Sequence, residues 1–91
     1  MNNLSKDFII HPGVTVKEKL EDIGITTNEL AMKTNFTLDY INGVINEKEN
    51  ITPEFAKVLE KVTDVSSTFW LNLQNNYEKE CKTLGGNVTN G

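Results

Sequence analysis

The side chains that most often carry covalent or metal chemistry are scarce in this sequence. Its 91 residues include one His, His11, and one Cys, Cys81. A single Cys cannot form an internal disulfide, and the two residues lack the partners that a catalytic nucleophile or a metal site requires. No glycine-rich loop of the phosphate-binding kind occurs either. The sequence therefore predicts no enzyme activity, no cofactor and no metal. We expect His11 to open a helix and Cys81 to lie on a late helix without a chemical role.

The charged side chains are mainly acidic. Thirteen Asp and Glu stand against nine Lys, no Arg occurs, and the formal net charge is -4. Overall charge does not draw such a chain to phosphates, and the chain lacks the Arg that makes the commonest specific contact to guanine. Contact with nucleic acid needs a local basic patch here, whereas an acidic surface suits a basic protein partner.

One small domain must position these side chains, because a chain of this length has no room for a second core. We expect an N-terminal arm at 1–10, a helical domain at 11–84 and a flexible tail at 85–91. No apolar run reaches the ~18 residues that span a bilayer. The N-terminus also lacks the long apolar region and cleavage site of a signal peptide. These features predict a cytoplasmic protein.

Helix-start and helix-end signals recur along the chain and predict five helices in a compact all-α bundle. The first begins at Pro12 and ends at Gly24, which suits a left-handed cap. The second begins after Thr26, which forms a capping box with Glu29. The third runs from about Leu38 to Asn46, and the last two follow caps at Thr52 and Ser66. We expect Phe69 and Trp70 to fill the core from the inner face of the last helix.

The second and third helices have the spacing of a helix-turn-helix, the frame in which many proteins place a helix in the major groove of DNA. Ala31 is the small residue needed where one helix crosses the other. Asn35, four positions later, is expected to take the left-handed conformation of the turn. Apolar anchors surround this pair at Leu30, Phe36, Ile41 and Val44.

Four short motifs add a resemblance to this frame: HPG at 11–13, NELA at 28–31, ITPE at 51–54 and FWLNLQ at 69–74. With them, from residue 9 or so to residue 80, the chain resembles the HigA/VapI-type antitoxins of the Xre-like helix-turn-helix family. The resemblance implies a five-helix domain of the Xre or lambda-repressor type, a homodimer, and repression of its own operon by binding operator DNA. It also implies a partner toxin, commonly an RNA-cleaving protein of the RelE-like type.

The resemblance also implies which side chains contact DNA. Base contacts fall to Thr37, Leu38, Asp39 and Gly43, phosphate contacts to Thr27, Asn46 and Lys48, and further contacts to Asn28, Tyr40 and Asn42. The recognition helix departs from the family pattern, because Tyr40 stands in a helix that often carries Arg. NEKENIT at 46–52 likewise replaces a loop like NGKRGIT. Asp39 accepts only from cytosine amino groups and repels phosphate, and Gly43 distinguishes no base. We therefore expect weak DNA binding.

Three functions remain open at this point. The first is an operator-binding antitoxin of a type II toxin–antitoxin system. The second is an acidic protein-interaction module on the same fold, with weak or lost DNA binding. The third is a mobile-element repressor without a toxin. A short basic reading frame beside the gene favours the first function over the third, and salt-dependent binding to its own promoter separates the first from the second.

Overall fold

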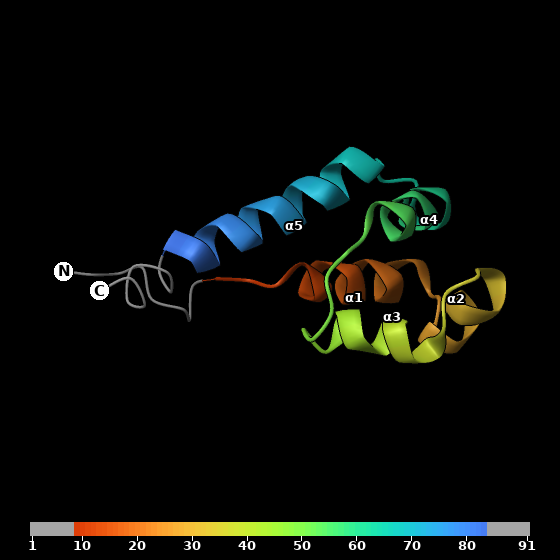
Figure 1. Ribbon diagram of the computed structural model, residues 1–91. Coiled ribbons are helices and arrows are strands. Elements are labelled where there is room, and N and C mark those ends of the chain that lie inside the picture. Colours follow the sequence, from red (N-terminus) through yellow and green to blue (C-terminus); the bar gives the residue numbers. More distant parts are fainter. Residues whose placement is uncertain (1–8, 84–91) are drawn as a thin grey trace.

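Five α-helices form the part of the chain that the structure, a computed structural model, describes: residues 9–83 (Figure 1). They are α1 (Pro12–Ile23), α2 (Thr27–Lys33), α3 (Leu38–Ile45), α4 (Pro53–Thr63) and α5 (Ser67–Cys81). The predicted all-α fold is confirmed, and every helix begins at the predicted residue. The predicted tail at 85–91 and most of the predicted arm at 1–10 lie outside the described residues. No helix within the described range is long and apolar enough to cross a membrane.

A side chain caps the N-terminus of each of these helices. The Thr26 hydroxyl accepts from the Glu29 N–H at 3.0 Å, and the Glu29 carboxylate accepts from the Thr26 N–H at 2.9 Å, which confirms the predicted capping box. His11 caps α1 through its ring, whose Nδ1 accepts from the Gly13 N–H at 2.8 Å. The predicted caps of α4 and α5 are also present. These bonds satisfy donors that a helix start leaves free, and so fix where each helix begins.

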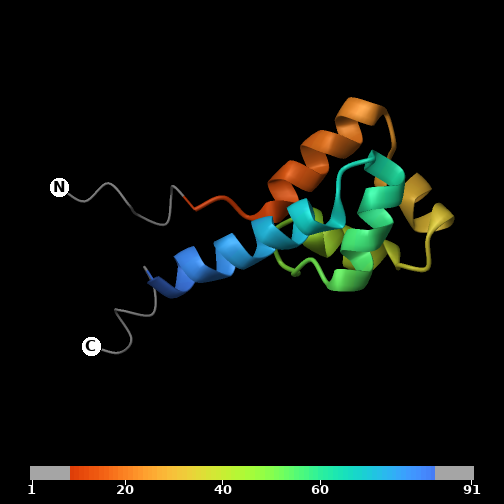
Figure 2. The same ribbon diagram turned by 90° about the horizontal axis from the view of Figure 1, so that it is seen from above.

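The core lies where α4 and α5 pack over α1 and α3 (Figures 1 and 2). Trp70 is 0% exposed, but its neighbour Phe69 is 43% exposed, so the prediction that both fill the core is wrong for Phe69. Successive helix positions point roughly 100° apart, so Phe69 is turned away from the face of α5 that Trp70 buries. Phe36 is half-buried, with its ring 5.0 Å from that of Phe55. The largest fully buried apolar side chains are Trp70, Phe55, Leu30, Ile41, Leu59, Val16 and Val44.

Gly13 allows α1 and α3 to lie unusually close together. A Cβ atom added at this position would sit 1.8 Å from the carbonyl oxygen of Val44. No side chain can occupy that space, so the two helices touch backbone to backbone near the start of α1. The Gly of the HPG motif is thus a packing requirement of the α1–α3 contact, which positions the recognition helix.

The turn between α2 and α3 differs from the prediction. Among the described residues the non-glycine positions with positive φ are Glu47 and Asp64, so Asn35 is not left-handed. The Thr34 hydroxyl closes this turn instead: it donates to the Leu30 carbonyl at 2.8 Å and accepts from the Phe36 N–H at 3.2 Å. These two bonds turn the chain without a left-handed residue at position 35.

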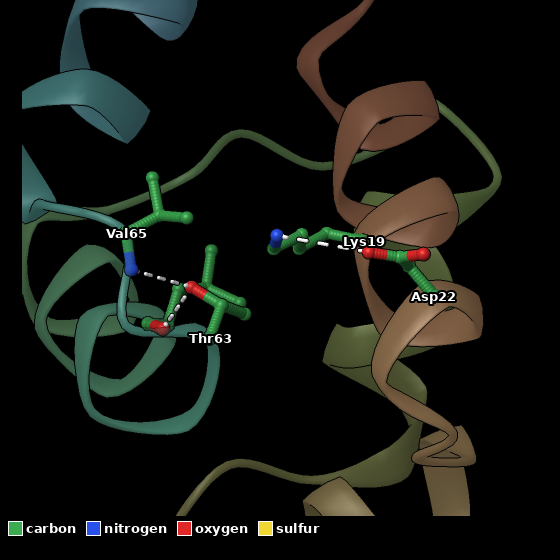
Figure 3. Close-up of polar contacts among 5 residues, drawn as sticks. Lys19, Asp22, Thr63 and Val65 are labelled. Atoms are coloured by element: carbon green, nitrogen blue, oxygen red, sulfur yellow. Dashed lines mark hydrogen bonds and ion pairs between the residues drawn. The ribbon is translucent and has the colours of Figure 1, made fainter.

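The end of α4 is closed by the same device. The Thr63 hydroxyl donates to the Leu59 carbonyl at 2.6 Å and accepts from the Val65 N–H at 3.1 Å (Figure 3). Lys19 extends from α1 toward this turn and pairs with Asp22 at 3.8 Å. The Thr34 bonds thus stand in for the left-handed residue predicted at Asn35, whereas the Thr63 bonds act beside a left-handed cap, Asp64.

Candidate nucleic-acid interface

The predicted contact residues all lie on α2, on α3 and in the segments that flank α3. Most of their side chains are exposed, and the exceptions are informative. Exposed are Asn28, Thr37, Leu38, Asp39, Asn46 and Lys48; half-buried are Thr27, Tyr40, Asn42 and Gly43. The described structure thus brings the ten residues into one helix-turn-helix unit, with six of them exposed and four half-buried.

The N-terminal turn of α3 presents a hydroxyl, an apolar side chain and a carboxylate. The Thr37 hydroxyl caps the helix by accepting from the Tyr40 N–H at 3.1 Å, and its own proton remains free to be donated. Leu38 is 37% exposed, so its methyl groups can reach a thymine methyl. Asp39 lies in the first helical turn, where its negative charge favours the helix dipole. The same charge repels a DNA phosphate.

Tyr40 positions the loop that follows α3. Its hydroxyl donates to the Asn50 carbonyl and accepts from the Thr52 N–H at 3.3 Å. Burial raises the pKa of the Tyr40 hydroxyl, and the nearby Glu49 and Glu54 carboxylates add to that rise. Both hydrogen-bonding functions of the hydroxyl are therefore committed within the chain. Tyr40 is therefore poorly placed to contact a base, because its hydroxyl points into loop 46–52.

Gly43 has a structural role in the same loop. Its carbonyl accepts from the Lys48 N–H at 2.7 Å and from the Glu49 N–H at 3.1 Å. A Cβ atom at position 43 would lie 2.5 Å from Cγ of Glu49, so Gly leaves room for the loop to fold back onto α3. The loop, and with it Lys48, is held against the helix by this contact.

Gln74 is a buried residue of this region that the sequence analysis missed. Its side-chain oxygen accepts from the Ile51 N–H at 2.8 Å, and its nitrogen donates to Asn50 at 3.1 Å and to Glu78 at 3.0 Å. Gln74 is 4% exposed. Its position four residues after Trp70, on the same face of α5, was the available signal. Gln74 ties loop 46–52 to α5, and Tyr40 ties it to α3.

Loop 46–52 also contains a strained residue. Glu47 has φ 67°, a left-handed conformation that costs a non-glycine residue roughly 1–2 kcal/mol. In the NGKRGIT-like loop of the family pattern, Gly stands at this position. Lys48 follows it, with a carboxylate on either side. The loop therefore offers one cation, Lys48, in an otherwise acidic setting.

The electrostatic balance of the whole unit is acidic. The start of α2 keeps backbone N–H groups beside Thr27 and Asn28 that can face a phosphate, but the Glu29 carboxylate occupies part of that helix start. Between residues 26 and 50 the charged side chains are Glu29, Lys33, Asp39, Glu47, Lys48 and Glu49. Within residues 9–83 no three His, Cys, Asp or Glu side chains are grouped so that they could hold a metal ion.

No family model matches the chain, but several curated proteins do. The chain is 36% identical over 69 residues to virulence-associated protein A of Dichelobacter nodosus, covering 74% of this chain and 68% of that protein. It is 35% identical to virulence-associated protein A' of the same organism and 38% identical to the uncharacterized HTH-type transcriptional regulator YbaQ of Escherichia coli (strain K12). These two matches cover 75% and 69% of this chain, and the chain spans only 60% and 57% of the two relatives' own lengths.

Solved structures give the same result for the fold. An addiction module antidote protein of a HigA family from Coxiella burnetii matches with a TM-score of 0.77 and 28% identity, over 90% of this chain and 92% of that one. The chain belongs to the HigA/VapI-type antitoxins of the Xre-like helix-turn-helix family. Pseudomonas aeruginosa antitoxin HigA with the higBA promoter matches with a TM-score of 0.76 and 28% identity, over 88% and 90% of the two chains.

A third structure is PA4674 of Pseudomonas aeruginosa in complex with its operator DNA. It matches with a TM-score of 0.71 and 30% identity, over 78% of this chain and 77% of that one. In this HigA/VapI-type chain, α2 and α3 form the helix-turn-helix unit of the family, so the predicted family and fold are confirmed. The individual contact residues remain predictions.

Proposed function

We propose that the chain is an operator-binding antitoxin that acts in the cytoplasm. It represses its own operon as a dimer and neutralises an RNA-cleaving toxin of the RelE-like type. The DNA-binding part of this proposal rests on one observation. The whole helix-turn-helix domain resembles antitoxin HigA with the higBA promoter, at a TM-score of 0.76. The likeness to an addiction module antidote protein supports the antitoxin part.

In this proposal the exposed start of α3 reads bases. Thr37 donates a hydrogen bond to a base edge, Leu38 contacts a thymine methyl, and Asp39 accepts from a cytosine amino group. Asn42 adds one further contact from the next turn of the helix. Tyr40 and Gly43 act as positioning residues, because their polar groups hold loop 46–52 in place.

Phosphate contacts come from both sides of α3. Thr27 and Asn28 face one phosphate from the start of α2, and Asn46 and Lys48 face another from the loop. With one Lys among these residues, few counterions are released on binding. The slope of log affinity against log salt is therefore shallow, roughly -2 to -4 per dimer.

Dimerisation compensates for the weak contacts of a single recognition helix. The C-terminal part of α5 extends past the bundle in both views (Figures 1 and 2), and Phe69 leaves 43% of its surface exposed on the same helix. Aromatic side chains are enriched at protein interfaces. We place the dimer contact on α5 and its neighbouring surfaces. Light scattering at micromolar concentration that finds only a 10.2 kDa species counts against this contact.

The test of DNA binding measures promoter affinity across a salt series for the full chain and three variants. Lys48→Ala should weaken binding to all sequences alike and make the salt slope shallower by about one unit per site. Asp39→Asn should raise non-specific affinity, because it removes a charge that repels phosphate. Lys61→Ala, at an exposed position in the last turn of α4, is the matched control and should change neither. If Lys48→Ala and Asp39→Asn also leave binding unchanged, α3 does not enter the groove.

A second candidate function takes over in that case. The four carboxylates and two Lys between residues 26 and 50 favour an acidic protein-interaction module on the same fold. That module would bind its partner without promoter DNA. A chain that binds its partner and shows no salt-dependent promoter binding supports it.

A further inference from the structure

A groove runs between α1 and the C-terminal end of α3, outside the surface assigned to DNA bases. It consists of two adjoining hollows of ≈ 450 Å³ and ≈ 480 Å³, which share Lys17, Glu21 and Ile45 in their walls. Leu20 and Ile25 complete the apolar part of the first hollow. We call the two hollows together the α1–α3 groove. Leu20 is buried, while Ile25 and Ile45 are half-buried and can contact an apolar side chain from another molecule.

The rim of the α1–α3 groove is acidic. Glu18, Glu21 and Glu47 line it from α1 and from the loop after α3, and all three are exposed. Lys17 is the one cation among the lining residues. An apolar floor with a mostly negative rim is complementary to a segment that carries an apolar side chain flanked by Lys or Arg.

The same charges argue against other occupants of the groove. DNA phosphates are repelled by the three carboxylates. A second copy of this chain is itself acidic, with a net charge of -4. The chain's own ends outside the described residues contain one Lys, Lys6, beside Asp7, and no other charged side chain. None of these has the basic character that the rim favours.

We propose that the α1–α3 groove is the docking site for a basic segment of the partner toxin, with an apolar side chain in the groove and Lys or Arg against the rim. This inference rests on the proposed antitoxin function and assigns the partner's face to α1 and the end of α3. The base-contacting start of α3 is left free, whereas Thr27 and Asn46 line the groove and are also proposed phosphate contacts.

The test titrates the purified protein encoded directly beside this chain's gene into the full chain by calorimetry. The double variant Glu18→Lys/Glu21→Lys should weaken binding by about tenfold or more, because like charges then face the basic segment. The control variant Glu54→Lys/Glu80→Lys makes the same change in net charge on exposed positions of α4 and α5. It should change affinity by less than about threefold, since distant exposed charges are screened by salt.

A second variant tests the groove through a change that should strengthen partner binding. Lys17→Glu removes the one cation of the lining and should tighten binding, by about threefold at low salt. Thermal unfolding followed by circular dichroism checks that each variant is folded. If the Glu18/Glu21 and control variants lose affinity equally, or if neither loses it, the groove is not the docking site while the antitoxin function stands. If the wild-type chain does not bind the neighbouring protein at all, the antitoxin function fails and this inference fails with it.

Discussion

The α4–α5 pair and the α2–α3 unit are held in place by different forces. The first buries large apolar side chains, with Phe55, Leu59 and Trp70 all 0% exposed. The second has one fully buried residue on α2 and two on α3, and its loop is positioned by the side chains of Tyr40 and Gln74. The α4–α5 pair therefore buries the two largest side chains of the core, Trp70 and Phe55, whereas the loop after the recognition helix is positioned by a few polar contacts.

The largest effect on stability should come from a substitution in the α4–α5 pair. We expect Trp70→Ala to lower the free energy of unfolding by roughly 3–5 kcal/mol, because it leaves a large cavity in the core. Phe69→Ala is the matched control, since Phe69 is its exposed neighbour on the same helix. It should cost much less stability and affect the dimer instead. Urea unfolding measures the first effect and sedimentation the second. Equal losses of stability would mean that α5 packs with a different face inward.

Gln74→Leu should have a smaller effect on stability and a marked one on the loop. The variant leaves the Ile51 N–H without its acceptor in a buried place, which costs roughly 1–3 kcal/mol. Loop 46–52 then loses its tie to α5, and Lys48 is presented less precisely. Amide hydrogen exchange at Ile51 and promoter affinity measure the two consequences. Asn75→Leu, at an exposed position of α5, should leave the hydrogen exchange of Ile51 unchanged; an equal response there would assign the effect to added apolar surface.

The sequence predicted local features of the fold better than contacts between distant parts of the chain. Helix starts were correct because Thr26 and Thr52 cap through local bonds that reach only three residues along the chain. The bond from Ile51 to Gln74 joins residues 23 apart, and no local pattern encodes it. The close approach of Gly13 to the Val44 carbonyl joins residues that are still farther apart in sequence. Sequence motifs predicted which helices form the candidate site, while the residues that position these helices and the loop became visible only in the folded chain.

The pH dependence of stability should report on the start of α1. His11 is buried, and burial lowers the pKa of its ring below the ordinary 6.5, although Glu47 opposes this shift. The neutral ring is the form that accepts from the Gly13 N–H. A lowered native pKa means that His11 contributes stability above pH 6.5, and that this contribution is lost as the pH falls from 6.5 through the native pKa.

Melting temperatures at pH 7.5 and pH 5.5 test this sign, since Asp and Glu titrate mostly lower, near pH ~4. His11→Asn keeps a capping side chain without a titratable ring and should flatten the dependence. The idea is wrong if the wild-type chain is more stable at pH 5.5 than at pH 7.5. A variant that keeps the full dependence would instead place its origin in other groups.

The smallest effects should come from two glycine substitutions in the α2–α3 unit, and they should have opposite signs. Glu47 is left-handed, so Glu47→Gly should relieve strain and stabilise the domain by about 1 kcal/mol or somewhat less. Asn35 lacks positive φ, so Asn35→Gly should only add freedom to the unfolded chain and cost roughly 0.5–1 kcal/mol. Urea midpoints of the two variants measure both changes. If Asn35→Gly instead stabilised the domain, residue 35 would have the left-handed conformation that the helix-turn-helix spacing predicted. Stabilisation by Glu47→Gly would show that the chain carries backbone strain where the family pattern has Gly, directly before Lys48, the residue that we propose faces a phosphate.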